Sequence, residues 1–217
     1  MIPPPGEVAE WPIAPVLKTG VGETPPRVRI PASPLLNKNS DVTWFYTNYG
    51  GCQGFGNQRY GPNGILSAAL DLNVSTAGVT DGLSNTALFS EFLHFDGTKA
   101  RLRLVWEVDP AFGSPANLEQ NITTCDSVPP NPASLGWTGG FRGAPWFDGY
   151  SGYNHMLPPN RPACMTSGPQ SGVSPPSSFH AQGVNLIYGD GHSAFMSQDI
   201  DTKVWRALGT RDSSEVQ

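Results

Sequence analysis

Glycine and proline limit what this chain can fold into more than any other feature of its sequence. The 217 residues include 25 glycines and 22 prolines, which together exceed a fifth of the chain. Proline fixes φ and lacks a backbone donor, and glycine favours turns, so both residue types interrupt helices. Charged residues make up only 14%, whereas about a quarter is typical of globular proteins. The composition predicts short strands, turns and long ordered loops, with aromatic residues supplying the core.

Net charge and hydropathy exclude some classes of partner. The formal net charge is -5 and no basic stripe is present, which argues against a nucleic-acid partner. The sequence has no run of 18 apolar residues, so it predicts no membrane span. It begins MIPPPG, which is unlike a secretory signal peptide.

Three cysteines, Cys52, Cys125 and Cys164, lie far apart in the sequence. Their spacing fits no zinc-binding pattern. Two interpretations remain open at this point. An exported protein would form one disulfide and keep one free thiol, whereas a chain in a reducing compartment would keep three free thiols.

The first 40 residues differ from the rest. Prolines interrupt every apolar stretch of residues 6–35, so that neither a helical nor a strand period survives. The segment resembles the peptide obtained when a serine transfer-RNA gene is translated as protein. We therefore expect residues 1–40 to be an unstructured leader that arises from gene prediction, and residues 41–217 to form the globular domain. The alternative is a genuine Pro-rich linker.

Within residues 41–217 the sequence predicts several strands and one helix. Residues 41–50 and 86–92 are aromatic or apolar and read as extended, and residues 101–108 alternate as in a half-buried strand. Residues 109–140 read as a long polar loop. The apolar run 184–188, the turn Gly189–Gly191 and the return strand 192–196 predict a hairpin. Asp199 or Asp201 is expected to cap a short helix over 202–208.

Several motifs of the domain resemble one family. His180, followed after nine residues by Asp190-Gly191, is similar to the terminal signature of prepilin-type proteins that carry domain of unknown function 1559. Three further blocks are similar to motifs of that family, and a short segment near residue 48 and the end of the chain add weaker matches. The matching residues are Gly183, Val184 and Asn185; Asp81, Gly82, Ser84, Asn85, Thr86 and Glu91; and Asn154, His155, Pro158, Pro159, Asn160 and Cys164.

The resemblance implies a fold and a role. Family members resemble pilins and type II secretion pseudopilins, in which an N-terminal helix packs on an antiparallel sheet. We therefore expect an α+β, mostly antiparallel β, pilin-like head that lacks this helix and leaves an apolar sheet face exposed. The resemblance also implies export, a membrane-anchored or cell-surface location, and other pilin-like subunits or secretion and pilus assembly machinery as partners.

Three classes of function follow. The first is a non-enzymatic structural or surface-assembly role, in which the motif residues are structural. The second is a calcium or small-solute binding module, with Asp190, Asp199 and Asp201 as calcium ligands. In the structural interpretation Asp190 fixes the hairpin turn and His180 bonds to it. The third is a hydrolase, which we do not expect, because neither G-x-S-x-G nor H-E-x-x-H occurs.

Overall fold

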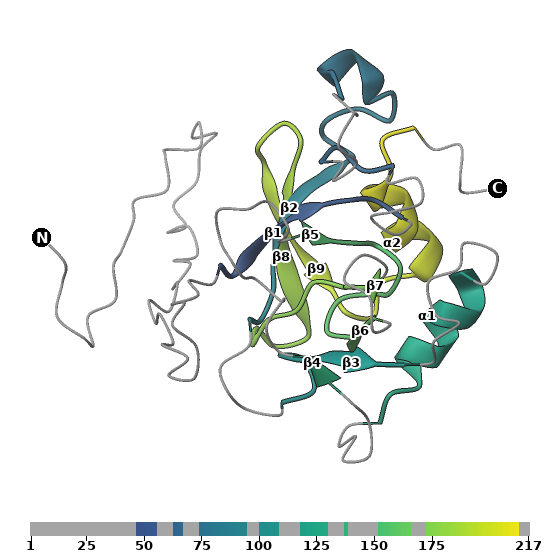
Figure 1. Ribbon diagram of the computed structural model, residues 1–217. Coiled ribbons are helices and arrows are strands. Elements are labelled where there is room, and N and C mark those ends of the chain that lie inside the picture. Colours follow the sequence, from purple (N-terminus) through teal and green to yellow (C-terminus); the bar gives the residue numbers. More distant parts are fainter. Residues whose placement is uncertain are drawn as a thin grey trace, which may run out of the picture.

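The computed structural model describes residues 47–55, 63–66, 74–94, 100–108, 118–129, 137–138, 152–165 and 172–212 (Figure 1). These residues form two β-sheets and two α-helices. The expected leader, residues 1–40, lies outside the described residues. None of the described helices is long and apolar enough to cross a membrane.

The larger sheet has five strands in the order β5-β1-β2-β8-β9. Strand β1 pairs with β2 in antiparallel and with β5 in parallel orientation, and β8 pairs antiparallel with both β2 and β9. The strands are β1 (Tyr49–Cys52), β2 (Ala87–Glu91), β5 (Gly152–Tyr153), β8 (Gly183–Tyr188) and β9 (Ser193–Ser197). The predicted buried strand and hairpin are thus confirmed as β2 and β8–β9.

The smaller sheet has four strands in the order β4-β3-β6-β7. Strand β6 pairs in parallel with β3 and antiparallel with β7, while β4 pairs antiparallel with β3. The strands are β3 (Val105–Glu107), β4 (Trp137–Thr138), β6 (Ala163–Met165) and β7 (Gly172–Val173). The mixture of two sheets with two helices confirms the α+β class, although the pairing is not purely antiparallel.

Two helices and one short 3₁₀ turn complete the described elements. Helix α2 (Thr202–Gly209) follows the hairpin, and the Asp201 carboxylate caps it by accepting from the N–H groups of Lys203 and Val204. The 3₁₀ turn η1 covers Thr76–Gly78. Helix α1 (Leu118–Asp126) lies where a polar loop was expected, so that prediction was wrong.

Each sheet has its own core. Helix α2 inserts Trp205 against the inner face of the five-stranded sheet, where Val184 and Leu186 are also fully buried. The opposite face of this sheet carries Phe89 and Phe195, which are 38% and 52% exposed. The second core lies between α1 and the smaller sheet and consists of Leu104, Trp106, Ile122, Cys125, Val128, Met156, Leu157, Cys164 and Val173.

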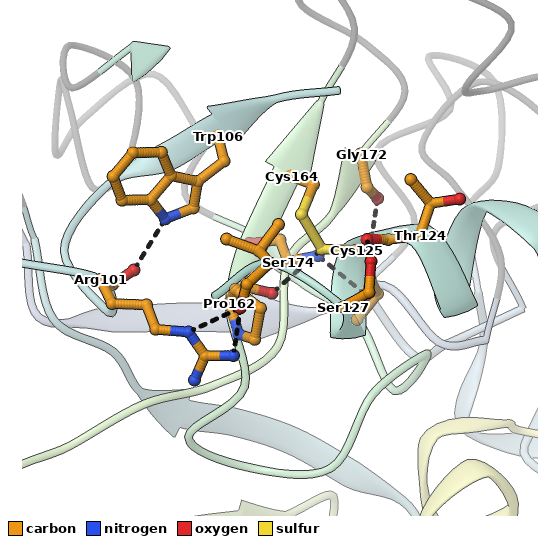
Figure 2. The surroundings of a disulfide bond; sticks show 11 residues. Arg101, Trp106, Thr124, Cys125, Ser127, Pro162, Cys164, Gly172 and Ser174 are labelled. Carbon is orange, nitrogen blue, oxygen red and sulfur yellow. Dashed lines mark hydrogen bonds between the residues drawn. A yellow bond between two sulfur atoms is a disulfide. The ribbon is translucent and has the colours of Figure 1, made fainter. Parts of the chain in front are cut away.

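The strand expected over residues 101–108 is largely a turn. Only Val105–Glu107 pairs with other strands, and the Arg103 N–H donates to the Ala100 carbonyl. The indole of Trp106 donates to the Arg101 carbonyl, and the Arg101 guanidinium donates to Val128 O beside α1 (Figure 2). Leu104 and Trp106 share a buried face, so the alternation correctly predicted burial, and the predicted strand is confirmed over Val105–Glu107.

A disulfide links Cys125 of α1 to Cys164 of β6 across 39 residues (Figure 2). Cys52 is a buried free thiol. Of the two interpretations of the cysteines, the structure supports one disulfide and one free thiol. The bond joins α1 to the smaller sheet inside the second core. Disulfides persist in oxidising compartments, so this pairing is relevant to the redox state of the compartment in which the protein functions.

Candidate functional site

The motif residues from distant parts of the sequence meet around the Glu91 carboxylate. Glu91 ends β2, and its Oε1 accepts from the backbone N–H of Asn185 at 2.7 Å and from the Asn185 side-chain amide at 3.1 Å. Its Oε2 lies 3.3 Å from Nε2 of His180. The Glu91 side chain is only 13% exposed, whereas His180 is 50% exposed. Two separate blocks of motif residues, one with Glu91 and one with His180 and Asn185, therefore form one cluster.

The irregular end of β2 explains why a carboxylate stands here. The Glu91 carbonyl accepts from Ser177 N–H instead of from β8. The N–H of Asn185 in β8 would then lack a backbone acceptor, and the Glu91 carboxylate supplies one. Ser90 continues the link, because its hydroxyl donates to the Asn185 carbonyl at 3.0 Å. The cluster thus closes the junction between β2 and β8 by side chains.

Tyr49 lies beside this cluster on β1, because its Cα is paired with that of Glu91. Burial, and to a lesser degree the charge of Glu91, raise the pKa of the Tyr49 phenol. The phenol therefore stays protonated near neutral pH. Tyr49 therefore does not supply a reactive phenolate beside Glu91, whose carboxylate accepts hydrogen bonds from Asn185.

His180 does not bond to Asp190, so that expectation was wrong. His180 lies before β8 and Asp190 lies after it, so the whole strand separates them. His180 pairs with Glu91, and Asp190 accepts from the backbone N–H and ring Nδ1 of His192 at 3.0 and 2.6 Å. The nine-residue spacing of the motif therefore spans β8 and carries one contact at each end.

The block Asp81 to Thr86 forms the turn that receives the hairpin tip. Gly82 has φ +90°, a conformation that suits glycine. The Asn85 amide donates to Asp81 O, and the Thr86 hydroxyl donates to Gly82 O. Thr86 O in turn accepts from Gly189 N–H of the hairpin. The turn lies against the hairpin, and Ser84 is exposed.

Asn154 and His155 lie where both sheets and α2 meet. The Asn154 side chain donates to Gly172 O and accepts from Ser174 N–H, so it connects β5 to the segment of β7. His155 stacks on Trp205 with ring centroids 3.8 Å apart. Its Nδ1 is 2.6 Å from Trp205 O; because a carbonyl only accepts, Nδ1 carries the proton.

Burial lowers the pKa of His155 to about 4. The imidazole is therefore neutral near pH 7, and its Nε2 is free of a proton. This nitrogen accepts from the Tyr153 hydroxyl at 3.4 Å. A neutral, fully buried histidine that stacks on Trp205 serves the packing of α2 and is closed to a substrate in solution.

The third block continues from this junction to the disulfide. Pro158 and Pro159 are buried, and Asn160 follows them with φ 60°, a left-handed conformation that asparagine tolerates. Asn160 Oδ1 accepts from Ser178 N–H, and its amide donates to Gln198 at 3.2 Å. Cys164 then forms the disulfide. Each motif side chain in this block thus bonds or packs against a distant segment.

The expected calcium ligands are not brought together. Asp190 lies at the tip of the hairpin, whereas Asp199 and Asp201 lie beyond the opposite end of β9. Asp201 is engaged as the helix cap and Asp190 is engaged by His192. In the described parts of the chain, no group of three His, Cys, Asp or Glu side chains is placed to hold a metal ion. These residues do not fit a calcium site.

The sequence did not point to a groove between the two helices. Its volume is about 480 Å³, and two ion pairs line it. Arg206 of α2 donates to both oxygens of Glu119 on α1 at 2.9 and 3.2 Å. Arg161 lies 3.5 Å from Asp126. The sequence analysis missed the groove because it did not predict α1, which forms one of its walls. The lining residues are Glu119, Ile122, Thr123, Asp126, Ser127, Met156, Leu157, Pro158, Arg161, Thr202 and Arg206.

Comparison with known protein families identifies the chain. The family described as "Protein of unknown function (DUF1559)" matches residues 22–203. The chain belongs to this family. The match covers most of the DUF1559 domain predicted over residues 41–217 and also includes residues 22–40. No curated protein and no solved structure shows significant similarity to the chain.

Proposed function

We propose that this DUF1559 protein is the globular, non-enzymatic part of an exported surface protein with a pilin-like, structural role. The observation that carries the proposal is the Cys125–Cys164 disulfide inside the second core. Disulfides are rare in reducing compartments and common in exported proteins. The bond holds α1 on the smaller sheet and so belongs to the fold itself.

The use of the motif residues supports a structural role. Glu91 bonds to Asn185 and His180, Asn154 joins two strands, and His155 is buried against Trp205. A catalytic carboxylate or imidazole needs access to substrate and a pKa matched to its task. These side chains instead bind other parts of the protein. A residue pattern that maintains a rigid head suits a subunit whose function depends on its surface.

The proposal can be tested in the native bacterium with the chromosomal gene carrying a C-terminal epitope tag. Intact cells are treated with protease, and free thiols are trapped with a maleimide reagent before lysis. We expect the tag to be cleaved from intact cells, and Cys125 and Cys164 to be protected from the reagent until reduction. Cys52, which is buried, should react only after denaturation.

The matched control is a cytoplasmic protein with the same tag, which must remain uncleaved. A tagged protein that resists protease until lysis, with all three cysteines reduced, would contradict export. The assembly role requires a second observation. Filaments sheared from the cell surface should contain the tagged protein, and its presence in the soluble extracellular fraction alone would contradict a pilin-like role.

The groove between α1 and α2 supports a second candidate, a small-solute binding module. Its two walls carry the pairs Arg206–Glu119 and Arg161–Asp126, and Ile122 contributes apolar surface. Such a groove suits a small zwitterion, because both signs of charge are offered. Thermal stability of the purified chain with mixtures of amino acids or short peptides tests it: a shift that Arg161→Gln abolishes would favour this candidate.

A further inference from the structure

Among the residues that the structure describes, strand β9 is an edge strand of the larger sheet. In the order β5-β1-β2-β8-β9 it occupies the end, and β8 is its only paired strand among the described residues. None of its residues is buried, whereas four of the six residues in β8 are. Its sequence, SAFMS, carries no charge and no proline. Exposed edge strands are ordinarily protected by such residues, because an unprotected edge pairs with other strands.

The orientation of the backbone groups follows from the hairpin. Tyr188 N–H donates to His192 O at one end, and Gln198 N–H donates to Gln182 O at the other. Hydrogen-bonded pairs alternate along an antiparallel ladder, so the even-numbered residues of β9 bond to β8. The N–H and C=O groups of Ser193, Phe195 and Ser197 therefore point away from β8. The Ser197 carbonyl also accepts from Ile200 N–H at 3.3 Å, and its second lone pair can still accept from an added strand.

The side chains leave this edge accessible. Phe195 is 52% exposed, and its ring lies over Gly183, where an added Cβ would come within 2.7 Å of it. The ring thus leans across β8 and away from the open side of the strand. Ala194 and Met196 point to the inner face and are partly exposed at the edge of the core. A strand added beside β9 would cover them.

The sequence of β9 is self-complementary about Phe195. In an antiparallel pair of two β9 strands related by a two-fold axis, Phe195 faces Phe195 of the second copy. Ser193 then faces Ser197, and Ala194 faces Met196. Because Ser193, Phe195 and Ser197 carry the outward groups, these facing positions are the hydrogen-bonded pairs, giving about six backbone hydrogen bonds. The small serines allow close approach on the outer face.

We propose that β9 pairs with β9 of a second copy of this chain, antiparallel and centred on Phe195, so that two five-stranded sheets become continuous. The pairing is isologous, as in most homodimers, and closes on itself. It gives partners to the outward backbone groups of β9, which β8 does not pair within the described part of the chain, and it extends the core over Ala194 and Met196. The inference does not depend on the proposed surface role.

The test is sedimentation velocity of the whole chain, with its disulfide intact, from about 1 μM to about 1 mM, a range that covers weak association. We expect the average mass of the wild type to rise toward that of a dimer. Ser193→Lys with Ser197→Lys places like charges opposite each other across the two-fold axis. This variant should weaken association by about tenfold or more, because facing like charges destabilise a strand pair.

The decisive control uses the same two positions. Ser193→Lys with Ser197→Glu places opposite charges across the axis, so association should stay within about threefold of the wild type. Both positions are exposed in the monomer, and circular dichroism and thermal unfolding should be measured to check that each variant folds. A wild type that stays monomeric overturns the proposal. The proposal is also overturned if the double-lysine variant associates as strongly as the wild type, or if both variants associate equally weakly.

Discussion

Polar side chains in this protein replace backbone partners at places where the strands end. Glu91 accepts the N–H of Asn185 that β2 leaves unpaired, and Asn154 bridges Gly172 and Ser174. A buried donor without an acceptor costs more than an ordinary hydrogen bond contributes. The geometry of the strand ends therefore accounts for the hydrogen-bonding side chains at these positions.

Glu91 should contribute to the free energy of unfolding. Glu91→Ala removes the acceptor of the Asn185 N–H and the partner of His180, and we expect a loss of about 1–3 kcal/mol in the free energy of unfolding. Glu91→Gln keeps one carbonyl oxygen for Asn185 and should lose less. Urea denaturation measures both. Glu107→Ala, an exposed position on β3, is the control and should change stability by less than about 0.5 kcal/mol; an equal loss there would refute the role of Glu91.

His155 should make stability depend on pH. Burial lowers its pKa from 6.5 to about 4, so the unfolded chain binds this proton at a higher pH than the folded chain does. Stability should therefore decrease as the pH falls from about 6.5 to about 4, by about 3 kcal/mol. Urea denaturation across this window should show the slope in the wild type.

The control for this effect is His155→Gln, which removes the titrating group. The difference in stability between wild type and variant should narrow as the pH falls, and parallel profiles would contradict the prediction. Should the variant fail to fold, NMR titration of the wild type decides: the His155 ring resonances should not report protonation above about pH 5, given a pKa of about 4.

At the scale of elements, local patterns predicted some segments well. The hairpin β8–β9 has its Asp-Gly turn, β2 begins with the apolar residues Ala87, Leu88 and Phe89, and α2 has an acidic cap and a closing glycine. Each carries its signal within a few residues. Helix α1 carries a sparser signal: Leu118, Ile122 and Cys125 recur at helical spacing, but they stand in a polar segment and are held by the disulfide and the second core.

The same contrast applies to the Glu91 cluster. The sequence singled out Glu91, His180 and Asn185 as motif residues, but not that they meet, because 94 residues separate Glu91 from Asn185. His180 was instead assigned to Asp190, which is nearer in sequence but separated from it by a whole strand. Periodicity identifies strands; it does not identify which strands become neighbours, and here the pairing of β2 with β8 decided the contact.

The cap of α2 gives a prediction for a single element. The Asp201 carboxylate accepts from two N–H groups, at 2.9 and 3.1 Å, that the helix leaves unpaired. Asp201→Ala should lower the free energy of unfolding by about 1 kcal/mol. Asp199→Ala is the matched control, an exposed acidic residue two positions earlier that does not cap the helix. Thermal unfolding of both variants checks this, and a larger loss at Asp199 would contradict the assignment.

For the molecule as a whole, the disulfide should contribute a large share of stability. Closing a loop of 39 residues restricts the unfolded chain by about 4 kcal/mol in the entropic treatment. Cys125→Ser with Cys164→Ser should lower the free energy of unfolding by about 2–5 kcal/mol. Urea denaturation without reductant measures this loss. Wild type with reductant should behave like the double variant, and Cys52→Ala should keep the sensitivity to reductant; an insensitive wild type would contradict the prediction.

The burial of Cys52 has a consequence for how the chain matures. Burial raises the pKa of its thiol to about 12, so only about one molecule in 10⁵ carries the nucleophilic thiolate at pH 7. In the folded protein, the thiol of Cys52 is therefore a poor nucleophile for exchange with the Cys125–Cys164 disulfide. In the unfolded chain any two of the three cysteines can be joined, and mispaired isomers compete with the native one. The yield of native protein then depends on two competing rates. The larger sheet must fold around Cys52 faster than an oxidant reacts with its thiol.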